Sequence, residues 1–228
     1  MPLNASQKKL LWRWEGRINK ILTEAKNRLA LELFDIGAIK FGTFRLKLHE
    51  KEPDAPLSPI YIDLRVLRSF PKAMDSAVEI YKGLIGKLIF DVYADVPIAA
   101  TPIVAILSHQ TKIPMISPRK EEREHGIKHA IDGAFKKGQV ALLVDDLITK
   151  ADSKLEAISA LEENGLNVQD VVVLIDREQG GVQELEKRGY TCHIAFKLKE
   201  LLKLYLESGK IGRQQYEQTV TYLDSTQT

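Results

Sequence analysis

Apolar and polar positions alternate along most of the chain in a way that separates strands from helices. Continuous apolar runs predict strands over residues 90–94, 114–116, 140–144, 171–175 and 191–196. Amphipathic stretches between these runs predict helices over residues 71–86, 98–107, 154–163 and 182–188. Strands that alternate with helices imply right-handed crossovers and a parallel sheet with helices on both faces. The pattern therefore predicts an α/β fold.

The N-terminal region predicts a long amphipathic helix over residues 6–34, with Gly37 after its end. Its apolar positions recur at helical spacing and are Leu10, Leu11, Trp14, Ile18, Ile21, Leu22, Ala25 and Leu29. The other face is basic, which fits either a solvated face on a packing helix or a helix that docks a protein partner or membrane surface. We predict that the apolar face packs on the core or on a second copy of the chain. The contacts expected there are Leu11, Trp14, Ile18 and Leu22.

Two weaker strands are predicted over residues 41–48 and 61–64. The segment between them, residues 49–59, contains three prolines and predicts a loop. Residues 209–228 are mostly polar and predict a frayed tail.

Composition narrows the class of protein. The 228 residues are 44% hydrophobic and 28% charged, which is ordinary for a globular protein and enough for one large domain. A net charge of +2 gives no general reason to expect a nucleic-acid partner. No apolar run reaches the roughly 18 residues of a membrane span, and an apolar signal core is missing. The single cysteine, Cys192, predicts a buried inert thiol, and we expect a cytoplasmic protein.

Candidate chemistry concentrates between Val140 and Ser153 (VALLVDDLITKADS). A buried strand ends there in Asp145 and Asp146, and a turn then leads into an amphipathic helix. Ser153 and Glu156 predict a capping box at the start of that helix, and Gly165 its end. Such a turn at the edge of a parallel sheet can bind a phosphate through its amides, while the acids bind ribose hydroxyls. The alternative for the two acids is a pair of solvated loop carboxylates.

This segment resembles the phosphoribosyl-pyrophosphate (PRPP) motif of type I phosphoribosyltransferases, and most of all that of orotate phosphoribosyltransferases. Five further stretches resemble that family in the same order along the chain: AIKFGTFRLK (38–47), SPIYIDLR (58–65), FDVYADVPIAATPIVAI (90–106), PMISPRKEEREHG (114–126) and VVVLIDREQGG (171–181). The resemblance implies a Rossmann-like fold with a central parallel sheet flanked by helices and a small N-terminal hood. It gives three regions, namely an N-terminal helix extension (1–32), a phosphoribosyltransferase-like domain (33–211) and a polar tail (212–228).

The resemblance also implies roles for single residues. Asp145 and Asp146 would act in catalysis by contacting the ribose hydroxyls of PRPP, with Mg²⁺ bound mainly through PRPP itself. Thr149 and Arg177 would contact orotate, because a guanidinium can bind a planar carboxylate or carbonyl edge. The PRPP and pyrophosphate contacts implied are Lys47, Arg119, Lys120, Arg123, His125, Thr149 and Ser153.

The charged loop within residues 114–126 resembles the mobile loop of this family. Its cations would close over the leaving pyrophosphate and exclude water, with Lys120 as the catalytic cation. The family loop reaches the site of a neighbouring subunit, which implies a homodimer. From the residues alone, the alternative is a charged loop that Glu121, Glu122 and Glu124 neutralise.

Several ligand loops depart from the family pattern. Asp95 stands where the family has glycine, the loop after Lys47 is longer, and the phosphate turn reads Lys150, Ala151 and Asp152. An aspartate within about 4 Å of a phosphate would cost on the order of a few kcal/mol. We therefore expect a remodelled PRPP site in a weakly active or non-catalytic paralogue with a binding or regulatory role. The alternative is an active enzyme of pyrimidine biosynthesis that makes orotidine 5′-monophosphate and pyrophosphate from orotate and PRPP.

Overall fold

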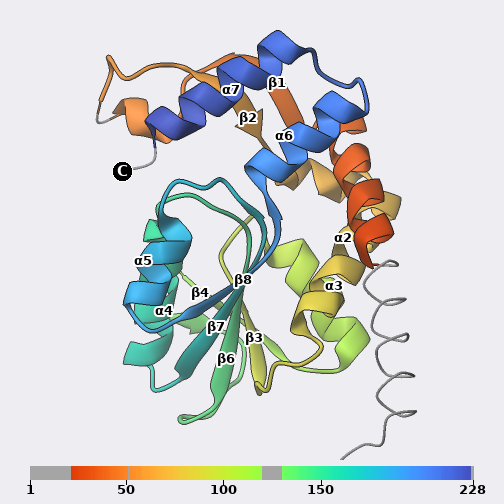
Figure 1. Ribbon diagram of the computed structural model, residues 1–228. Coiled ribbons are helices and arrows are strands. Elements are labelled where there is room, and N and C mark those ends of the chain that lie inside the picture. The colour runs from red at the N-terminus through yellow and green to blue at the C-terminus, as the bar shows by residue number, and fades with distance from the viewer. Residues whose placement is uncertain (1–21, 51, 120–129, 227–228) are drawn as a thin grey trace, which may run out of the picture.

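The structure, a computed structural model, describes residues 22–50, 52–119 and 130–226. A six-stranded sheet in the order β5-β4-β3-β6-β7-β8 forms the centre of the molecule (Figure 1). All neighbouring strands are parallel except β5, which pairs with β4 in the antiparallel sense. Its strands are β3 (Val92–Asp95), β4 (Met115–Pro118), β5 (Ile131–Asp132), β6 (Val140–Ile148), β7 (Asn167–Asp176) and β8 (Thr191–Lys197). The predicted α/β fold with a central parallel sheet is confirmed.

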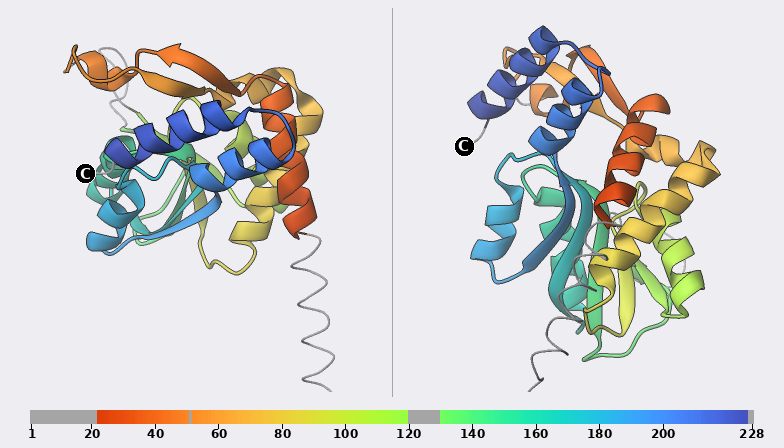
Figure 2. Two further views of the ribbon diagram at one scale, coloured as in Figure 1. Left: turned by 45° about the horizontal axis from the view of Figure 1, so that its top comes forward. Right: turned by 45° about the vertical axis from the view of Figure 1, so that its right-hand side comes forward.

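Helices cover both faces of this sheet, and each face has its own apolar core (Figures 1 and 2). On one face lie α2 (Pro71–Ile85) and α3 (Thr101–Thr111), together with the helical residues 22–35. On the other face lie α4 (Asp152–Glu163) and α5 (Gly181–Lys187). Alternate residues of β6 pack in the two cores, with Leu142 on the α2 side and Leu143 on the α4 side.

A second layer lies over the edge of the sheet where the parallel strands end (Figure 1). It contains the antiparallel pair β1 (Ile39–Phe44) and β2 (Ser58–Ile62), two 3₁₀ helices (Lys47–Glu50 and Leu64–Ser69), and the helices α6 (Leu198–Glu207) and α7 (Arg213–Ser225). The Tyr205 hydroxyl of α6 donates to the Ala30 carbonyl over 2.8 Å. This layer is the hood that the resemblance implies, and it contains the C-terminal helices as well as the N-terminal strands.

The division into regions 1–32, 33–211 and 212–228 stays a prediction, but two described helices bear on its ends. One helix runs from residue 22 to residue 35 across the first boundary, with Leu29 and Leu33 fully buried. Residues 213–225 form α7 instead of a frayed tail, because Thr219, Tyr222 and Leu223 give it a buried face. Of the predicted contacts of the N-terminal helix, Leu22 is 36% exposed. The other three, Leu11, Trp14 and Ile18, lie outside the described residues.

Most predicted elements are confirmed within a few residues, but four details are wrong. Strand β6 continues through both acids to Ile148, since Leu147 and Ile148 still pair with β7. Strand β1 ends at Phe44, where a 3₁₀ turn follows in which the ring of His49 binds the Leu46 amide. Helix α3 begins at Thr101 and not at residue 98. Helix α4 begins at Asp152 and has no side-chain cap, so the predicted capping box is absent.

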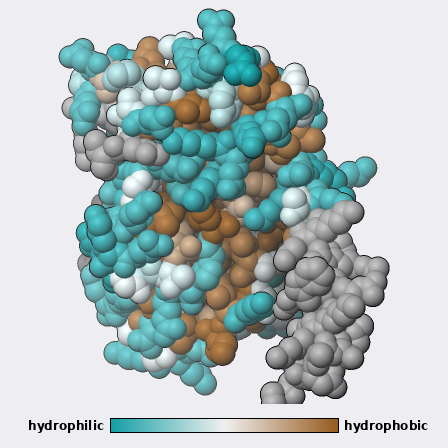
Figure 3. Space-filling view, viewed as in Figure 1, coloured by the Kyte–Doolittle hydropathy of each residue, from teal (hydrophilic) through white to brown (hydrophobic). Residues whose placement is uncertain are grey.

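The surface in the view of Figure 1 is unevenly polar. Apolar residues gather below the hood, over the strands and the α2–α3 side, whereas the hood and the α4–α5 flank are largely hydrophilic (Figure 3). Within the described ranges, no helix is both long and apolar enough to cross a membrane. Cys192 is partly buried, and burial raises the pKa of its thiol to about 12, as expected of an inert thiol.

Candidate functional site

The acidic residues of three neighbouring strands meet at one edge of the sheet. Asp95 ends β3, Asp145 and Asp146 lie near the end of β6, and Asp176 ends β7. These strands are adjacent in the order β3-β6-β7, and Asp95 pairs with Val144 next to the acids of β6. Ligands of open α/β sheets bind outside this edge. The topology therefore brings the predicted PRPP motif and the predicted orotate contact together.

The carboxylate of Asp145 points towards α4 and is paired with a buried lysine. Lys154 Nζ lies 2.5 Å from Asp145 Oδ2, and both side chains are 5% exposed. The same ammonium donates to the Leu147 carbonyl, and the Tyr81 hydroxyl donates to the Asp145 carbonyl over 2.7 Å. Two elements thus hold the β6 backbone and the first acid from opposite faces of the sheet.

Asp146 faces the other side of the sheet, with Leu142 and Val144. Its Oδ1 accepts a hydrogen bond of 2.7 Å from the Leu147 amide. Burial, and next the charge of Asp145, raise the pKa of Asp146 to about 7, while Lys154 opposes the rise. One acid is therefore neutralised by a lysine, and the other is poised to gain or lose a proton near neutral pH. Neither is an ordinary solvated loop carboxylate.

The predicted phosphate turn adopts a backbone that suits glycine but contains alanine. Ala151 has φ +73° and is the residue before helix α4. An L-residue in this left-handed region is strained by roughly 1–2 kcal/mol. Asp152, the first residue of α4, is exposed, as is Lys150 before it. A carboxylate at a helix N-terminus suits the helix dipole, but its negative charge would oppose a phosphate bound at the same N-terminus.

Glycine is essential at one contact between the two ligand loops. Gly181, at the start of α5, donates from its amide to the Thr149 carbonyl over 2.8 Å. A Cβ at this position would lie 2.3 Å from that carbonyl oxygen and 2.7 Å from a side-chain carbon of Ile148. Helix α5 can approach the phosphate turn this closely only because residue 181 has no side chain.

Asp95 does not point towards the surface where a phosphate would approach. Its side chain is fully buried, and Oδ2 accepts a hydrogen bond from the Thr101 hydroxyl at the start of α3. The other carboxylate oxygen has no partner within the described ranges. The carboxylate is turned inward to the start of α3, which gives no support to a direct clash of Asp95 with a bound phosphate.

Arg177 follows β7 and is buried at 6% exposure. Its Nε and Nη2 have no hydrogen-bond partner among the residues that the structure describes. Burial lowers the pKa of the guanidinium, and the Tyr222 phenol partly offsets this. The alternative of an ion pair with Asp176 or Glu178 is not seen. An unpartnered buried guanidinium is unfavourable by itself and suits an anionic ligand.

The predicted cations of the mobile loop are described only in part. Arg119 is paired with Asp132 of β5, and its Nε donates to Oδ2 over 2.7 Å. Lys120, Arg123 and His125 lie outside the described residues, and the backbone of Lys47 begins a 3₁₀ helix. Thr149 and Ser153 are partly buried in the phosphate turn. Their contacts to PRPP stay predictions.

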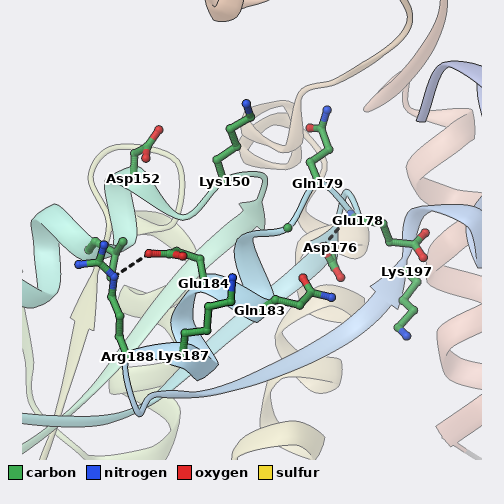
Figure 4. A pocket seen from close by; sticks show the side chains of 12 residues that line it. Lys150, Asp152, Asp176, Glu178, Gln179, Gln183, Glu184, Lys187, Arg188 and Lys197 are labelled. Carbon is green, nitrogen blue, oxygen red and sulfur yellow. Dashed lines mark hydrogen bonds and ion pairs between the residues drawn. The ribbon is translucent and has the colours of Figure 1, made fainter. Parts of the chain in front are cut away.

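A cavity of about 640 Å³ opens beside the phosphate turn, on the side of α5 (Figure 4). Lys150 and Asp152 point away from the sheet at its rim, and an ion pair joins Arg188 to Glu184 (Figure 4). The charged residues of its lining are Lys150, Asp152, Asp176, Glu178, Glu184, Lys187, Arg188 and Lys197. Because four acids balance four bases there, this cavity lacks the positive excess that a polyphosphate needs.

Known proteins resemble the chain in both sequence and structure. A bifunctional enzyme PyrF/PyrE of Nostoc sp. is 35% identical over 188 residues, which are 82% of this chain and 38% of that protein. An orotate phosphoribosyltransferase of Pyrobaculum aerophilum is 34% identical over 84% of this chain and 95% of its own length. This chain belongs to the orotate phosphoribosyltransferase family. No family model matches it.

Solved structures of this family share the fold. The UMP synthase of Leishmania donovani superposes with a TM-score of 0.78 at 36% identity, over 87% of this chain and 42% of that one. The chain thus spans about 40% of the length of the Nostoc and Leishmania proteins and almost all of the Pyrobaculum orotate phosphoribosyltransferase.

Sequence reasoning missed three residues of the site, namely Lys154, Gly181 and Tyr222. A signal for Lys154 was present, because a lysine in the first turn of a helix opposes the helix dipole and needs a nearby acid. The close contact of Gly181 and the burial of Tyr222 depend on how separate elements pack, which the sequence pattern does not reveal.

Proposed function

We propose that the protein is an orotate phosphoribosyltransferase that transfers the phosphoribosyl group of PRPP to orotate, giving orotidine 5′-monophosphate and pyrophosphate. The observation that carries this proposal is the buried, unpartnered guanidinium of Arg177. Orotate is a planar carboxylate with two ring carbonyls, and it would supply the acceptors that this side chain lacks. A family member that had lost orotate would leave a buried cation without compensation.

The remaining residues take roles that follow from their surroundings. Asp146, whose carboxylate accepts only an amide of its own strand among the bonds described, would accept hydrogen bonds from the ribose hydroxyls. Asp145, held by Lys154, would be the second acceptor at the ribose. No three His, Cys, Asp or Glu residues of the described ranges cluster as a metal cage. Mg²⁺ would arrive with PRPP and shield its phosphates.

The mobile loop would complete the site. Arg119, the last described residue before this loop, is paired with Asp132. We propose that Lys120, Arg123 and His125 close over the pyrophosphate of a neighbouring subunit, which requires a homodimer. Light scattering at micromolar concentration should give twice the mass of one chain, and a monomer would remove the shared site. A cytoplasmic location and a partner for the N-terminal helix stay predictions.

The phosphate turn favours a second candidate, a weakly active or non-catalytic paralogue that binds or regulates. Ala151 strains the turn, and Asp152 places a negative charge at the start of α4. Asp95 no longer supports this candidate by direct contact, because its carboxylate is buried against Thr101. The second candidate therefore rests on the turn alone.

Calorimetry with PRPP–Mg²⁺ and orotate, added separately and together, decides between the candidates when combined with an assay of orotidine 5′-monophosphate. The proposed enzyme binds both ligands and forms product. The comparison variant is Ala151→Gly with Asp152→Thr. If the unmodified chain shows weak PRPP binding and no turnover, and this variant gains roughly 5- to 150-fold in PRPP affinity, the second candidate replaces the first.

A further inference from the structure

Helix α7 buries a tyrosine whose hydroxyl has no partner. Tyr222 is 8% exposed, and its neighbour Leu223 is fully buried. The Tyr222 hydroxyl oxygen finds no donor or acceptor in the described part of the chain. An apolar contact would have been served equally well by phenylalanine. A buried hydroxyl without a partner costs about 1–3 kcal/mol, so it calls for an acceptor from outside the chain.

The same region holds the unpartnered guanidinium. Thr226, directly after α7, contacts Gln179, which lies two residues after Arg177. Arg177 follows β7, whereas Tyr222 lies on the last helix of the chain. Two buried side chains with unpartnered donor atoms, from distant parts of the sequence, therefore lie on the two segments that meet where α7 contacts the loop after β7.

Contacts to α6 and α7 fix the loop that contains Arg177. Gln179 Nε2 donates to the Thr226 hydroxyl over 3.3 Å. Glu178 Oε2 accepts from the Lys199 amide over 2.8 Å, and Lys199 Nζ pairs with Asp224 of α7 at 2.6 Å. These contacts hold the end of α7 against the loop after β7. The position of the Tyr222 hydroxyl is thus coupled to that of the guanidinium.

We propose that α7 is a wall of the orotate site and that the Tyr222 hydroxyl donates a hydrogen bond to orotate beside Arg177. The inference rests on the proposed function and adds to it a binding residue from the C-terminal helix. Orotate suits both donors, because its carboxylate and its ring carbonyls are all acceptors. A tyrosine donor also disfavours a ring that presents an N–H at this position.

The test is Tyr222→Phe, which removes one oxygen and keeps the ring that packs α7. Orotate affinity, measured by calorimetry without PRPP so that no turnover occurs, should fall about 3- to 30-fold, as for loss of one buried hydrogen bond. The dissociation constant of PRPP alone should stay within about two-fold, and the melting temperature should not fall, because the free chain loses no bond.

Tyr205→Phe is the matched control. Tyr205 is also a fully buried tyrosine of the hood, but its hydroxyl already donates to Ala30. Its loss should lower the melting temperature and leave orotate affinity unchanged. The opposite pattern in the two variants separates ligand binding from packing.

An orotate affinity of Tyr222→Phe equal to that of the unmodified chain would overturn the inference, and so would an equal loss for orotate and PRPP. The proposed function fails separately. The unmodified chain could bind orotate more tightly than Tyr222→Phe and still form no orotidine 5′-monophosphate. That result would support the role of Tyr222 in orotate binding and would contradict the proposed transferase activity. A chain that binds no orotate under any condition overturns both.

Discussion

The two ligand loops that follow the neighbouring strands β6 and β7 differ in which residues occupy their left-handed and closely packed backbone positions. After β6, the turn at residues 149–153 places Ala151 at φ +73°. After β7, the loop places Gly180 at φ +89° and uses Gly181 where a Cβ would strike the Thr149 carbonyl. The second loop has glycine at these two positions, although Glu178 before them also has a positive φ of +57°. The first loop has a left-handed alanine followed by an exposed acid.

The difference follows from what surrounds each loop. Arg177 and Gln179 are buried, and Glu178 and Gln179 are hydrogen-bonded to Lys199 of α6 and to Thr226 after α7, so a change there disturbs the core of the hood. Lys150 and Asp152 are exposed, and water screens their charges when no ligand is present. Substitutions therefore persist more easily on the phosphate side than on the orotate side. This places any loss of affinity on PRPP before orotate.

The largest effect is expected beneath the phosphate turn. Lys154→Met leaves the buried carboxylate of Asp145 without its partner, and breaking a buried ion pair costs about 3–5 kcal/mol. Urea unfolding should show this loss. Lys203→Met, which removes an exposed pair with Glu207 at 3.8 Å, should cost less than about 1 kcal/mol. Equal losses in the free energy of unfolding for the two variants would show that Asp145 is not stabilised by Lys154 of α4.

Gly181→Ala tests whether the loop after β7 and the phosphate turn depend on each other. Its new Cβ would overlap the Thr149 carbonyl, so α5 or the phosphate turn must shift, at a cost of about 1–3 kcal/mol. PRPP affinity should fall together with the free energy of unfolding. Gly212→Ala is the control, because nothing lies near the Cβ that it adds. If Gly181→Ala weakens neither stability nor PRPP binding, the two loops are independent.

The apolar runs were sufficient to predict the central sheet, since buried strands have a strong hydrophobic signal. The end of β6 was not predictable in this way, because the strand continues through the polar residues Asp145 and Asp146, the first of which is paired with the buried Lys154. Helix α7 was not predicted from the sequence, for a related reason. Its buried face uses a threonine and a tyrosine among polar residues, and only packing shows that these are inside.

For the site, the sequence was enough to predict where residues lie but not their protonation or hydrogen bonding. The family resemblance was enough to bring Asp146 and Arg177 to one edge of the sheet. Their states depend on burial, which raises the pKa of one and leaves the other unpartnered. The direction in which Asp95 points was also beyond the sequence, because it depends on the start of α3.

Titration of Asp146 gives a moderate effect that depends on pH. Its pKa of about 7 in the folded chain lies above the ordinary value of 3.8. As pH rises from about 4 to about 7, the unfolded chain releases this proton and the folded chain retains it, so the free energy of unfolding falls. Asp146→Asn should remove this part of the slope and be the more stable protein above about pH 7. Parallel stability curves for the two proteins would contradict the raised pKa.

The smallest effect tests the comparison of the two loops directly, by exchanging their glycine and alanine. Ala151→Gly removes a left-handed alanine and should raise the free energy of unfolding by up to about 1 kcal/mol, because glycine adopts φ +73° without strain but gains entropy when unfolded. Gly180→Ala creates the same strain at φ +89° and should lower it by about 1 kcal/mol. The ligands should respond in opposite ways, with PRPP affinity rising a few-fold in the first variant and orotate affinity falling in the second. Urea unfolding and calorimetry on both proteins check this. If Ala151→Gly gains neither stability nor PRPP affinity, the turn is already shaped for its ligand, and strain does not distinguish the phosphate side from the orotate side.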